Sequence, residues 1–421
     1  MNTNYCQYSN FKVSNHKFEL PLNYSNNDSV TITIFVREII NLDKEKENQP
    51  YLIFFQGGPG YQSPRPISIS GWIKRACEDY KVLLIDQRGT GLSTPICSRS
   101  FEGRSDQEIA DYLTHFRADN IVRDAEEIRK IIIGDDRWSI LGQSFGGFCA
   151  MHYLSFYQDS LDKVYITGGI PPLDAHPDDI YRRTYKRVLD KNNLFYNTFP
   201  QAINRVSRIA DYLIDNEVYL PNGDLLSIQR FQQLGLNLGF SDGMPMLNFL
   251  FEEAFNDKKI SYLFLKNILS IQTFDTNPIF TVLHEACYAQ NFATNWSANR
   301  ILDEFKDFRL YNNKKLFFTG EMLYPWMLDD YQELRVFKNA ANIIAEKKDW
   351  PKLYDEKTLI NNKVPIAAAV YTNDMYVDRD YSISLANIIP NINIWETNEY
   401  EHNALRSDGK KVLDLLFERI K

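Results

Sequence analysis

Cysteine is scarce in this sequence, and long apolar runs are missing from it. The 421 residues include five cysteines, which are scattered, odd in number and never spaced as C-x-x-C. This usage argues against a disulfide framework and structural zinc, and it is typical of a reducing cytoplasm. No stretch approaches the roughly 20 apolar residues that span a bilayer. Residues 1–5 lack the basic and apolar regions of a signal peptide, so we expect a cytoplasmic protein.

Positive charge is also in short supply. The formal net charge is −8, with 24% charged and 44% hydrophobic residues. An acidic balance favours solubility and argues against nucleic acid or an anionic membrane as the main partner. The length is enough for one large domain or for two or three smaller units. We therefore expect an ordinary globular protein that binds neither nucleic acid nor a membrane.

The pattern of apolar and polar residues in the first part of the chain is typical of a sheet. Residues 11–39 alternate apolar and polar side chains, which predicts antiparallel strands. Residues 51–55, 82–85 and 163–167 are short strand-like runs, and the first two are apolar without interruption. Uninterrupted apolar runs are typical of strands buried on both faces of a parallel sheet. Between them, residues 118–133 carry apolar side chains at helical spacing.

The texture changes at about residue 174. From there to about residue 345 the sequence is rich in aromatic residues and its pattern is mainly helical, with residues 316–318 as the one candidate sheet strand. Strand-like texture returns at residues 364–370 and 391–395, and a helix is predicted from about residue 403 to the end.

These patterns predict one α/β core that is interrupted by a helical cap. The core would consist of residues 1–173 and 346–421, and the insertion of residues 174–345. The expected fold is a mostly parallel sheet with helices on both faces, with the insertion lying over the carboxyl ends of the strands. Ligands bind at that edge of such sheets.

The central motif is Gly-Gln-Ser-Phe-Gly-Gly at residues 142–147. It lies between a predicted strand at 137–141 and a predicted helix at 148–157. A G-x-S-x-G sequence at such a junction is typical of the nucleophile elbow of an α/β hydrolase. The sharp turn leaves the hydroxyl group of Ser144 exposed above the sheet and requires small neighbours such as Gly142 and Gly146.

A serine nucleophile needs a base and an orienting acid, and in this fold they follow in the order serine, acid, histidine. Of the six histidines, only His284 and His402 lie well beyond the elbow. His402 follows the last predicted strand, where the base belongs, whereas His284 falls within the insertion. Asp374 comes first after the preceding strand and is the favoured acid, with Asp378 as the alternative. The acid would hold the imidazole in the required tautomer.

Stabilisation of a tetrahedral oxyanion requires backbone donors that are already in place. The Gly-Gly-Pro-Gly loop at residues 57–60 follows a predicted strand, and we expect Gly58 to supply one donor. The amide of Phe145, directly after the nucleophile, would supply the other. The loop at residues 86–93, D-Q-R-G-T-G-L-S, follows the next strand, and we expect its charged residues to brace loops rather than to do chemistry.

A metal site is disfavoured. His284 and Glu285 begin an H-E-x-x-H pattern, but position 288 is Tyr288 rather than histidine. We therefore expect no metal and no cofactor. Taken alone, Glu285 and Glu321 would most simply be solvated surface charges.

Together, the loops at 56–60 and 86–93, the elbow at 142–147 and the segment His-Asn-Ala-Leu-Arg at 402–406 resemble the proline iminopeptidases, or prolyl aminopeptidases, of the α/β-hydrolase serine peptidases. The resemblance covers nearly the whole chain. The length and the segment at 320–327 resemble the larger subgroup of that family. Gln56 stands where many relatives carry histidine.

The resemblance implies a triad of Ser144, Asp374 and His402, an acyl-enzyme on the serine, and release of N-terminal proline from small peptides. It also implies that cap carboxylates, supplied by Glu285 and Glu321, bind the free amino terminus of the substrate. A carboxylic esterase or a broad-specificity aminopeptidase with the same triad is the alternative function. A catalytically silent binding protein of this fold is disfavoured because the serine, acid and histidine are all present.

Overall fold

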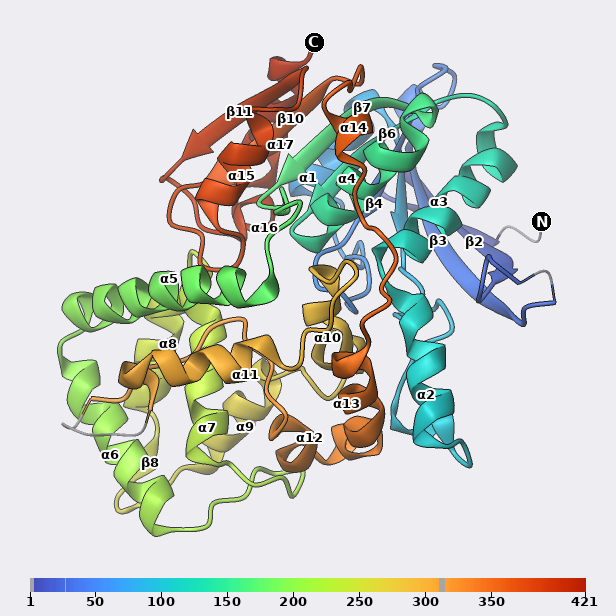
Figure 1. Cartoon of the computed structure of the whole chain (residues 1–421). Helices are drawn as coiled ribbons and strands as arrows, with labels where there is room; N and C mark the ends of the chain where they lie inside the picture. The colour runs from blue at the N-terminus through green and yellow to red at the C-terminus, as the bar shows by residue number, and fades with distance from the viewer. Residues whose placement is uncertain (1–3, 27, 310–314) are drawn as a thin grey trace.

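The computed structural model describes residues 4–26, 28–309 and 315–421. Part of the segment inspected for a signal peptide, residues 1–3, lies outside this description. In Figure 1 the sheet and most of its helices occupy the upper half of the molecule, and a second, mainly helical body lies below it.

Within the described residues, nine strands form one sheet in the order β1-β2-β3-β5-β4-β6-β7-β10-β11. The strands from β5 to β11 in that order pair in parallel, whereas β1, β2 and β3 form an antiparallel extension at one edge. The strands are β1 (Asn4–Tyr8), β2 (Phe11–Pro21), β3 (Thr31–Asn41), β4 (Tyr51–Phe55), β5 (Lys81–Ile85), β6 (Trp138–Gln143), β7 (Leu161–Thr167), β10 (Ile366–Tyr371) and β11 (Ile392–Thr397).

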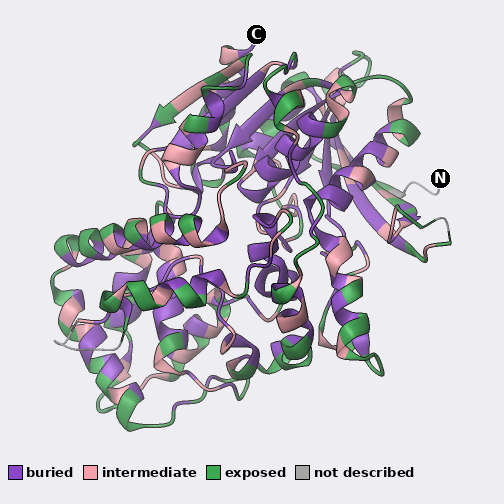
Figure 2. Ribbon diagram, viewed as in Figure 1, coloured by how far each residue is buried: buried purple, intermediate pink, exposed green. Residues whose placement is uncertain are grey.

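The central strands are buried on both faces, as their uninterrupted apolar sequences predict. In β4, Leu52 and Phe54 belong to one buried cluster, whereas Ile53 and Phe55 belong to the cluster on the opposite face. Figure 2 shows the burial of these central strands, whereas the edge strand β11 is largely half-buried or exposed. The helices of the core are α1 (Gly71–Asp79), α2 (Asp106–Leu113), α3 (Ala118–Ile133), α4 (Phe145–Tyr157), α14 (Glu356–Leu359), α15 (Arg379–Ala386), α16 (Ala404–Ser407) and α17 (Gly409–Arg419).

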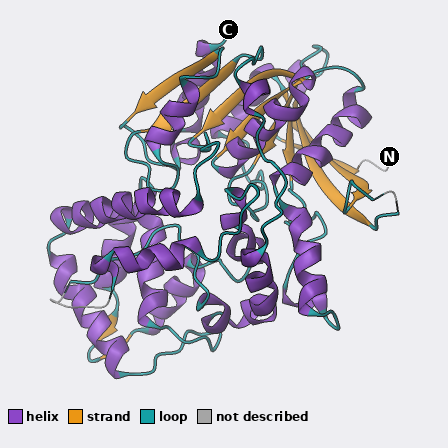
Figure 3. Cartoon of the chain, in the orientation of Figure 1, coloured by secondary structure: helices purple, strands orange, loops and turns teal. Residues whose placement is uncertain are grey.

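The chain leaves the sheet after β7 and returns at β10, and the segment between them is mainly helical (Figure 3). Within the described residues its strands are limited to a short hairpin of β8 (Phe255–Asn256) and β9 (Lys259–Ile260). Its helices are α5 (Pro177–Thr198), α6 (Gln201–Asp215), α7 (Ile228–Gln232), α8 (Gly243–Glu252), α9 (Tyr262–Ile271), α10 (Pro278–Leu283), α11 (Ser297–Ile301), α12 (Met327–Asp330) and α13 (Lys338–Glu346). No helix in the described ranges has the length and apolar character needed to cross a membrane.

Residues 316–318, the candidate strand of the insertion, belong to neither sheet, so that interpretation was wrong. A side chain takes the place of a neighbouring strand. Asn192 of α5 accepts a hydrogen bond from the backbone N–H of Phe318 at 2.7 Å and donates one to the Phe318 carbonyl at 2.8 Å. The buried backbone is thereby satisfied without a ladder.

The loop at residues 86–93 braces its surroundings. Arg88 is fully buried and donates to both oxygens of Asp124 at 2.6 and 2.8 Å, and it also donates to three backbone carbonyl groups. Asp86 accepts two hydrogen bonds from Arg65, each at 2.8 Å. These contacts tie the loop to the first strands and to α3.

Because Arg88 is buried, loss of its counter-ion leaves an uncompensated charge in the core. We expect Asp124→Asn to lower the free energy of unfolding by about 3–5 kcal/mol, measured by urea denaturation. Asp135→Asn removes the same charge from the exposed end of the turn after α3 and should change stability by no more than about 0.5 kcal/mol. Equal effects of the two substitutions would contradict a buried structural role for the pair.

Candidate active site

Ser144 stands at a turn that leaves no room for side chains. Its backbone has φ 54° and ψ −123°, outside the regions that non-glycine residues prefer. A methyl group on Gly146 would lie 2.0 Å from the carbonyl oxygen of Phe55, and one on Gly142 would lie 2.4 Å from the carbonyl oxygen of Gly146. The backbone of the elbow therefore lies directly against β4, and the serine is placed at the carboxyl edge of the sheet.

The structure brings Asp374 and His402 together. The Nδ1 atom of His402 lies 2.6 Å from Oδ2 of Asp374, in the loop after β10. The other carboxylate oxygen of Asp374 accepts hydrogen bonds from the backbone N–H groups of Tyr376 at 2.8 Å and Val377 at 3.1 Å. The carboxylate is held by its own loop, and it fixes the orientation of the imidazole ring.

Asp378, the alternative acid, and His284, the other histidine well beyond the elbow, have different contacts. Asp378 caps α15 by accepting backbone hydrogen bonds at its amino end, and its carboxylate also contacts Arg183 and Arg187 of α5. The Nε2 atom of His284 lies 3.7 Å from a carboxylate oxygen of Glu321. The described contacts therefore pair His402 with Asp374 rather than with Asp378.

The pKa of His402 reflects two opposing effects. Burial disfavours the imidazolium form, but the charge and hydrogen bond of Asp374 and the charges of Glu321 and Glu401 together outweigh it, so the pKa of His402 is raised above its usual 6.5. An imidazole in this setting is suited to accept a proton from a neighbouring hydroxyl group.

Ser144 and His402 line one cavity of about 740 Å³. The loop at residues 57–60 forms part of its wall, with Gly58 among the lining residues. This loop lies against the elbow, because a methyl group on Gly57 would approach the Cβ atom of Ser144 to 3.0 Å. Phe145 begins α4, and the first N–H groups of a helix have no carbonyl partner within the helix. Phe145 thus follows the serine directly in the chain, and Gly58 adjoins Gly57, which lies against the serine.

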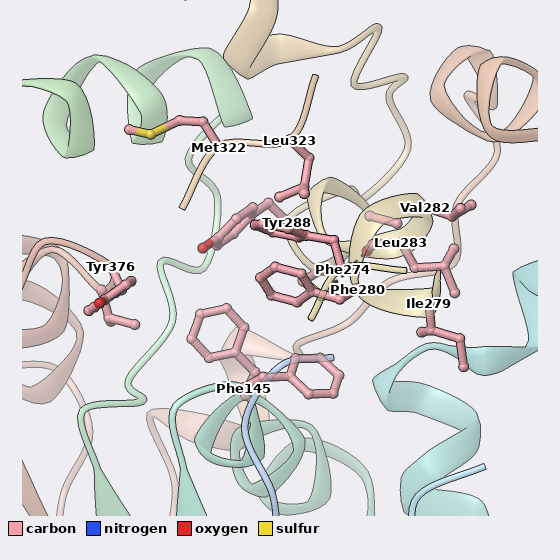
Figure 4. Close-up of a cluster of buried hydrophobic side chains, with 14 of the residues drawn as sticks. Phe145, Phe274, Ile279, Phe280, Val282, Leu283, Tyr288, Met322, Leu323 and Tyr376 are labelled. Atoms are coloured by element: carbon pink, nitrogen blue, oxygen red, sulfur yellow. Dashed lines mark hydrogen bonds between the residues drawn. The ribbon is translucent and has the colours of Figure 1, made fainter. Parts of the chain in front are cut away.

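The insertion covers the elbow with apolar side chains. Figure 4 shows Phe280 and Leu283 of α10, together with Tyr288, in one apolar cluster with Phe145, and Ile279 of α10 at the edge of the cluster. Phe280 contributes to the cavity wall, and so do Tyr61 and Tyr376, which the sequence did not single out. The ring of Phe280 meets that of Tyr61 edge-on with centroids 5.3 Å apart.

Glu321 and Asp242 are the carboxylates of the insertion that line the cavity, and Glu321 is the one predicted to bind the substrate amine. It lines the wall, and 17% of its side chain is exposed. Burial raises its pKa to about 8; Asp374 acts in the same direction and His402 opposes it. Within the described part of the chain, no lysine or arginine forms an ion pair with Glu321. A partly dry acid without a cationic partner is suited to bind a cation.

Glu285 has a different environment. It is not among the residues that line the cavity, and its two oxygens accept hydrogen bonds from the backbone N–H groups of Ser297 and Ala298, each at 2.9 Å. The carboxylate therefore caps the amino end of α11. Burial raises its pKa to about 7, whereas the backbone hydrogen bonds act in the opposite direction.

Metal ligands do not gather in the described parts of the chain: residues 4–26, 28–309 and 315–421 contain no cluster of three or more His, Cys, Asp or Glu side chains arranged to hold an ion. The five cysteines are free thiols.

The chain was compared with known proteins. The family model of the α/β hydrolase fold matches residues 50–208. The chain is 47% identical to a proline iminopeptidase of Aeromonas sobria over 402 residues, covering 95% of each chain. It is 34% identical to a proline iminopeptidase of Aspergillus aculeatus, covering 96% of this chain and 93% of the relative.

Among solved structures, esterase E22 is similar with a TM-score of 0.52 at 11% identity, covering 97% of this chain and 100% of the esterase chain. A likeness at this identity concerns the fold alone. The resemblance inferred from the sequence motifs and the predicted fold class are confirmed. The chain belongs to the proline iminopeptidase family and has the α/β hydrolase fold.

Proposed function

We propose that this protein is a serine aminopeptidase that releases N-terminal proline from small peptides. The observation that carries the proposal is the shared cavity: Ser144, His402 with its partner Asp374, and the unpaired carboxylate Glu321 meet there. Two relatives that match nearly the whole chain are proline iminopeptidases by name. Peptide substrates require both a nucleophile and a site for the amino terminus, and this cavity has candidates for each.

In the proposed reaction, the hydroxyl oxygen of Ser144 attacks the carbonyl carbon of the N-terminal residue while the Nε2 atom of His402 accepts the hydroxyl proton. The backbone N–H groups of Gly58 and Phe145 stabilise the oxyanion. His402 then donates its proton to the leaving amine, and an acyl-enzyme remains on the serine. Water, activated by the same histidine, releases proline and restores the free enzyme.

The two carboxylates are proposed to contribute to amine binding at different distances. Glu321 contacts the ammonium group directly, since it reaches the cavity. Glu285 does not line the cavity and would act on the amine at longer range. Both carboxylates lie close enough to Tyr181 to affect it: burial raises the pKa of its hydroxyl well above the ordinary value, and the charges of Glu285 and Glu321 add to this effect. The negative potential of both groups would favour a protonated secondary amine.

The apolar wall supports the choice of proline. Phe280, Tyr61 and Tyr376 line the cavity, and aromatic side chains stabilise contacts with a compact apolar group through buried area. A simple esterase has no need of an unpaired acid facing the acyl group, so Glu321 favours the aminopeptidase over the esterase alternative. A prolyl aminopeptidase and a broad-specificity aminopeptidase differ in their tolerance for N-terminal residues other than proline.

We also propose that residues 174–345 act as a cap over the site and that the protein works in the cytoplasm. The predicted limits of the cap fall next to the start of α5 and the end of α13. Five free thiols, three of them buried, suit a reducing compartment.

Covalent catalysis is tested by Ser144→Ala. Loss of the nucleophile should reduce kcat on prolyl β-naphthylamide by roughly 10⁴ or more, because members of a triad act as a unit. Folding should be retained, as checked by circular dichroism, and a chelator should leave the parent enzyme unaffected. Near-normal turnover by the variant would rule out the serine mechanism.

Amine recognition is tested by Glu321→Gln, which keeps the size of the side chain and removes its charge. We expect kcat/KM on prolyl amides to fall. The loss should correspond to about 2–5 kcal/mol of transition-state stabilisation, by analogy with a broken buried charge pair. Activity on an activated ester that has no amine should fall far less, because the triad is unchanged. Equal losses on both substrates would show that Glu321 is structural.

Glu285→Gln provides a contrast. The amide places an NH₂ group opposite backbone N–H groups that now donate to the carboxylate, so the melting temperature should fall. A selective loss of prolyl-amide activity at unchanged stability would instead place Glu285 in direct contact with the amine.

The pH profile provides an independent test. Catalysis requires neutral His402, whose pKa is raised, and ionised Glu321, whose pKa is about 8. We expect kcat/KM on prolyl amides to rise with pH up to about pH 8 and to fall when the substrate amine, with a pKa of about 8, loses its proton. In Glu321→Gln the rising limb should move to lower pH, since the charge of Glu321 also raises the pKa of His402. If the rise of kcat/KM occurs at the same pH in Glu321→Gln, ionisation of Glu321 is not required for activity.

A further inference from the structure

The cavity that holds Ser144 and Glu321 is also lined by Trp72 from the start of α1, Phe240 from the turn before α8, and Arg406 from α16. If the amino terminus of a peptide is held at Glu321, the leaving part must occupy another part of the same cavity. Trp72, Phe240 and Arg406 are therefore candidates to contact the second and later residues of a substrate.

A stack of rings connects the proposed base to Arg406. The ring of Tyr376 lies 4.5 Å from that of His402, the ring of Phe240 lies 5.7 Å from that of Tyr376, and the Arg406 guanidinium lies 5.0 Å from the Phe240 ring. An extended peptide advances about 3.3 Å per residue. The three steps set an upper limit on the separation of the His402 ring and the guanidinium, and about five residues of extended peptide would span that limit. The guanidinium therefore lies within reach of the end of a short peptide.

The guanidinium of Arg406 is available for an anion. The other arginine of the wall, Arg65, is engaged by both oxygens of Asp86 at 2.8 Å. No ion pair of Arg406 occurs among the described residues, and its side chain is exposed. Asp242 also lines the cavity, so the wall has no general positive field, and an anion would be recognised by the guanidinium itself.

We propose that Arg406 is a specificity-determining residue that binds the C-terminal carboxylate of short peptides. A guanidinium forms paired, charge-assisted hydrogen bonds with a carboxylate, and stacking on Phe240 limits the freedom of the side chain. The cavity then holds a zwitterion, with the ammonium group at Glu321 and the carboxylate at Arg406. This inference rests on the proposed aminopeptidase function and restricts its preferred substrates to short peptides with a free carboxyl end.

The test compares matched acids and amides. We expect the parent enzyme to prefer Pro-Gly or Pro-Gly-Gly over the same peptide with an amidated carboxyl end by about tenfold in kcat/KM, and this preference should weaken with added salt. In Arg406→Gln the preference should disappear, with activity on the amidated peptide and on prolyl β-naphthylamide changed by less than about twofold. Arg406→Lys, which retains charge but not the planar fork, should keep part of the preference.

Lys410→Gln is the matched control. It also removes one positive charge, and Lys410 lies four residues after Arg406 but does not line the cavity. It should leave the preference intact. If Arg406→Gln lowers activity on acid and amide equally, or if the parent enzyme shows no preference, Arg406 does not bind a carboxylate. Activity of the parent enzyme on prolyl β-naphthylamide is independent of this outcome, and its absence would instead contradict the aminopeptidase function.

Discussion

The site depends on a close approach of backbone to backbone at the elbow. Gly146 lies so near the carbonyl group of Phe55 that any side chain would displace the helix α4 from the sheet. The same contact holds Ser144 in its strained conformation and brings the loop at residues 57–60 against it. The proposed nucleophile, the expected oxyanion donors and the end of β4 are thus positioned by one steric constraint, which the surrounding buried strands enforce.

The insertion adds chemistry that the sheet does not provide. The sheet edge offers a serine, a histidine and an aspartate, and these could serve many acyl-transfer reactions. Glu321 brings an acid whose pKa is raised by burial, and α10 adds the apolar side chains above Phe145. The proposed selectivity for a free amino terminus therefore resides in the insertion, whereas the proposed bond cleavage resides in the core.

The sequence predicted those features that depend on local pattern. The apolar run of β4, the helix α3 and the elbow at residues 142–147 are each readable from neighbouring residues. Features made by distant residues were not readable. Asn192 satisfies the backbone of Phe318 in place of a strand, and Glu285 accepts hydrogen bonds from the amino end of α11. The stack that links His402 to Arg406 also joins separate segments, and no spacing in the sequence indicates it.

The most direct test is a crystal structure of the Ser144→Ala protein with a bound Pro-Gly peptide. The account predicts the proline amine within hydrogen-bond distance of Glu321 and the scissile carbonyl oxygen at the N–H groups of Gly58 and Phe145. A peptide bound with its amine in solvent, or with its carbonyl group turned away from residue 144, would contradict the proposed site.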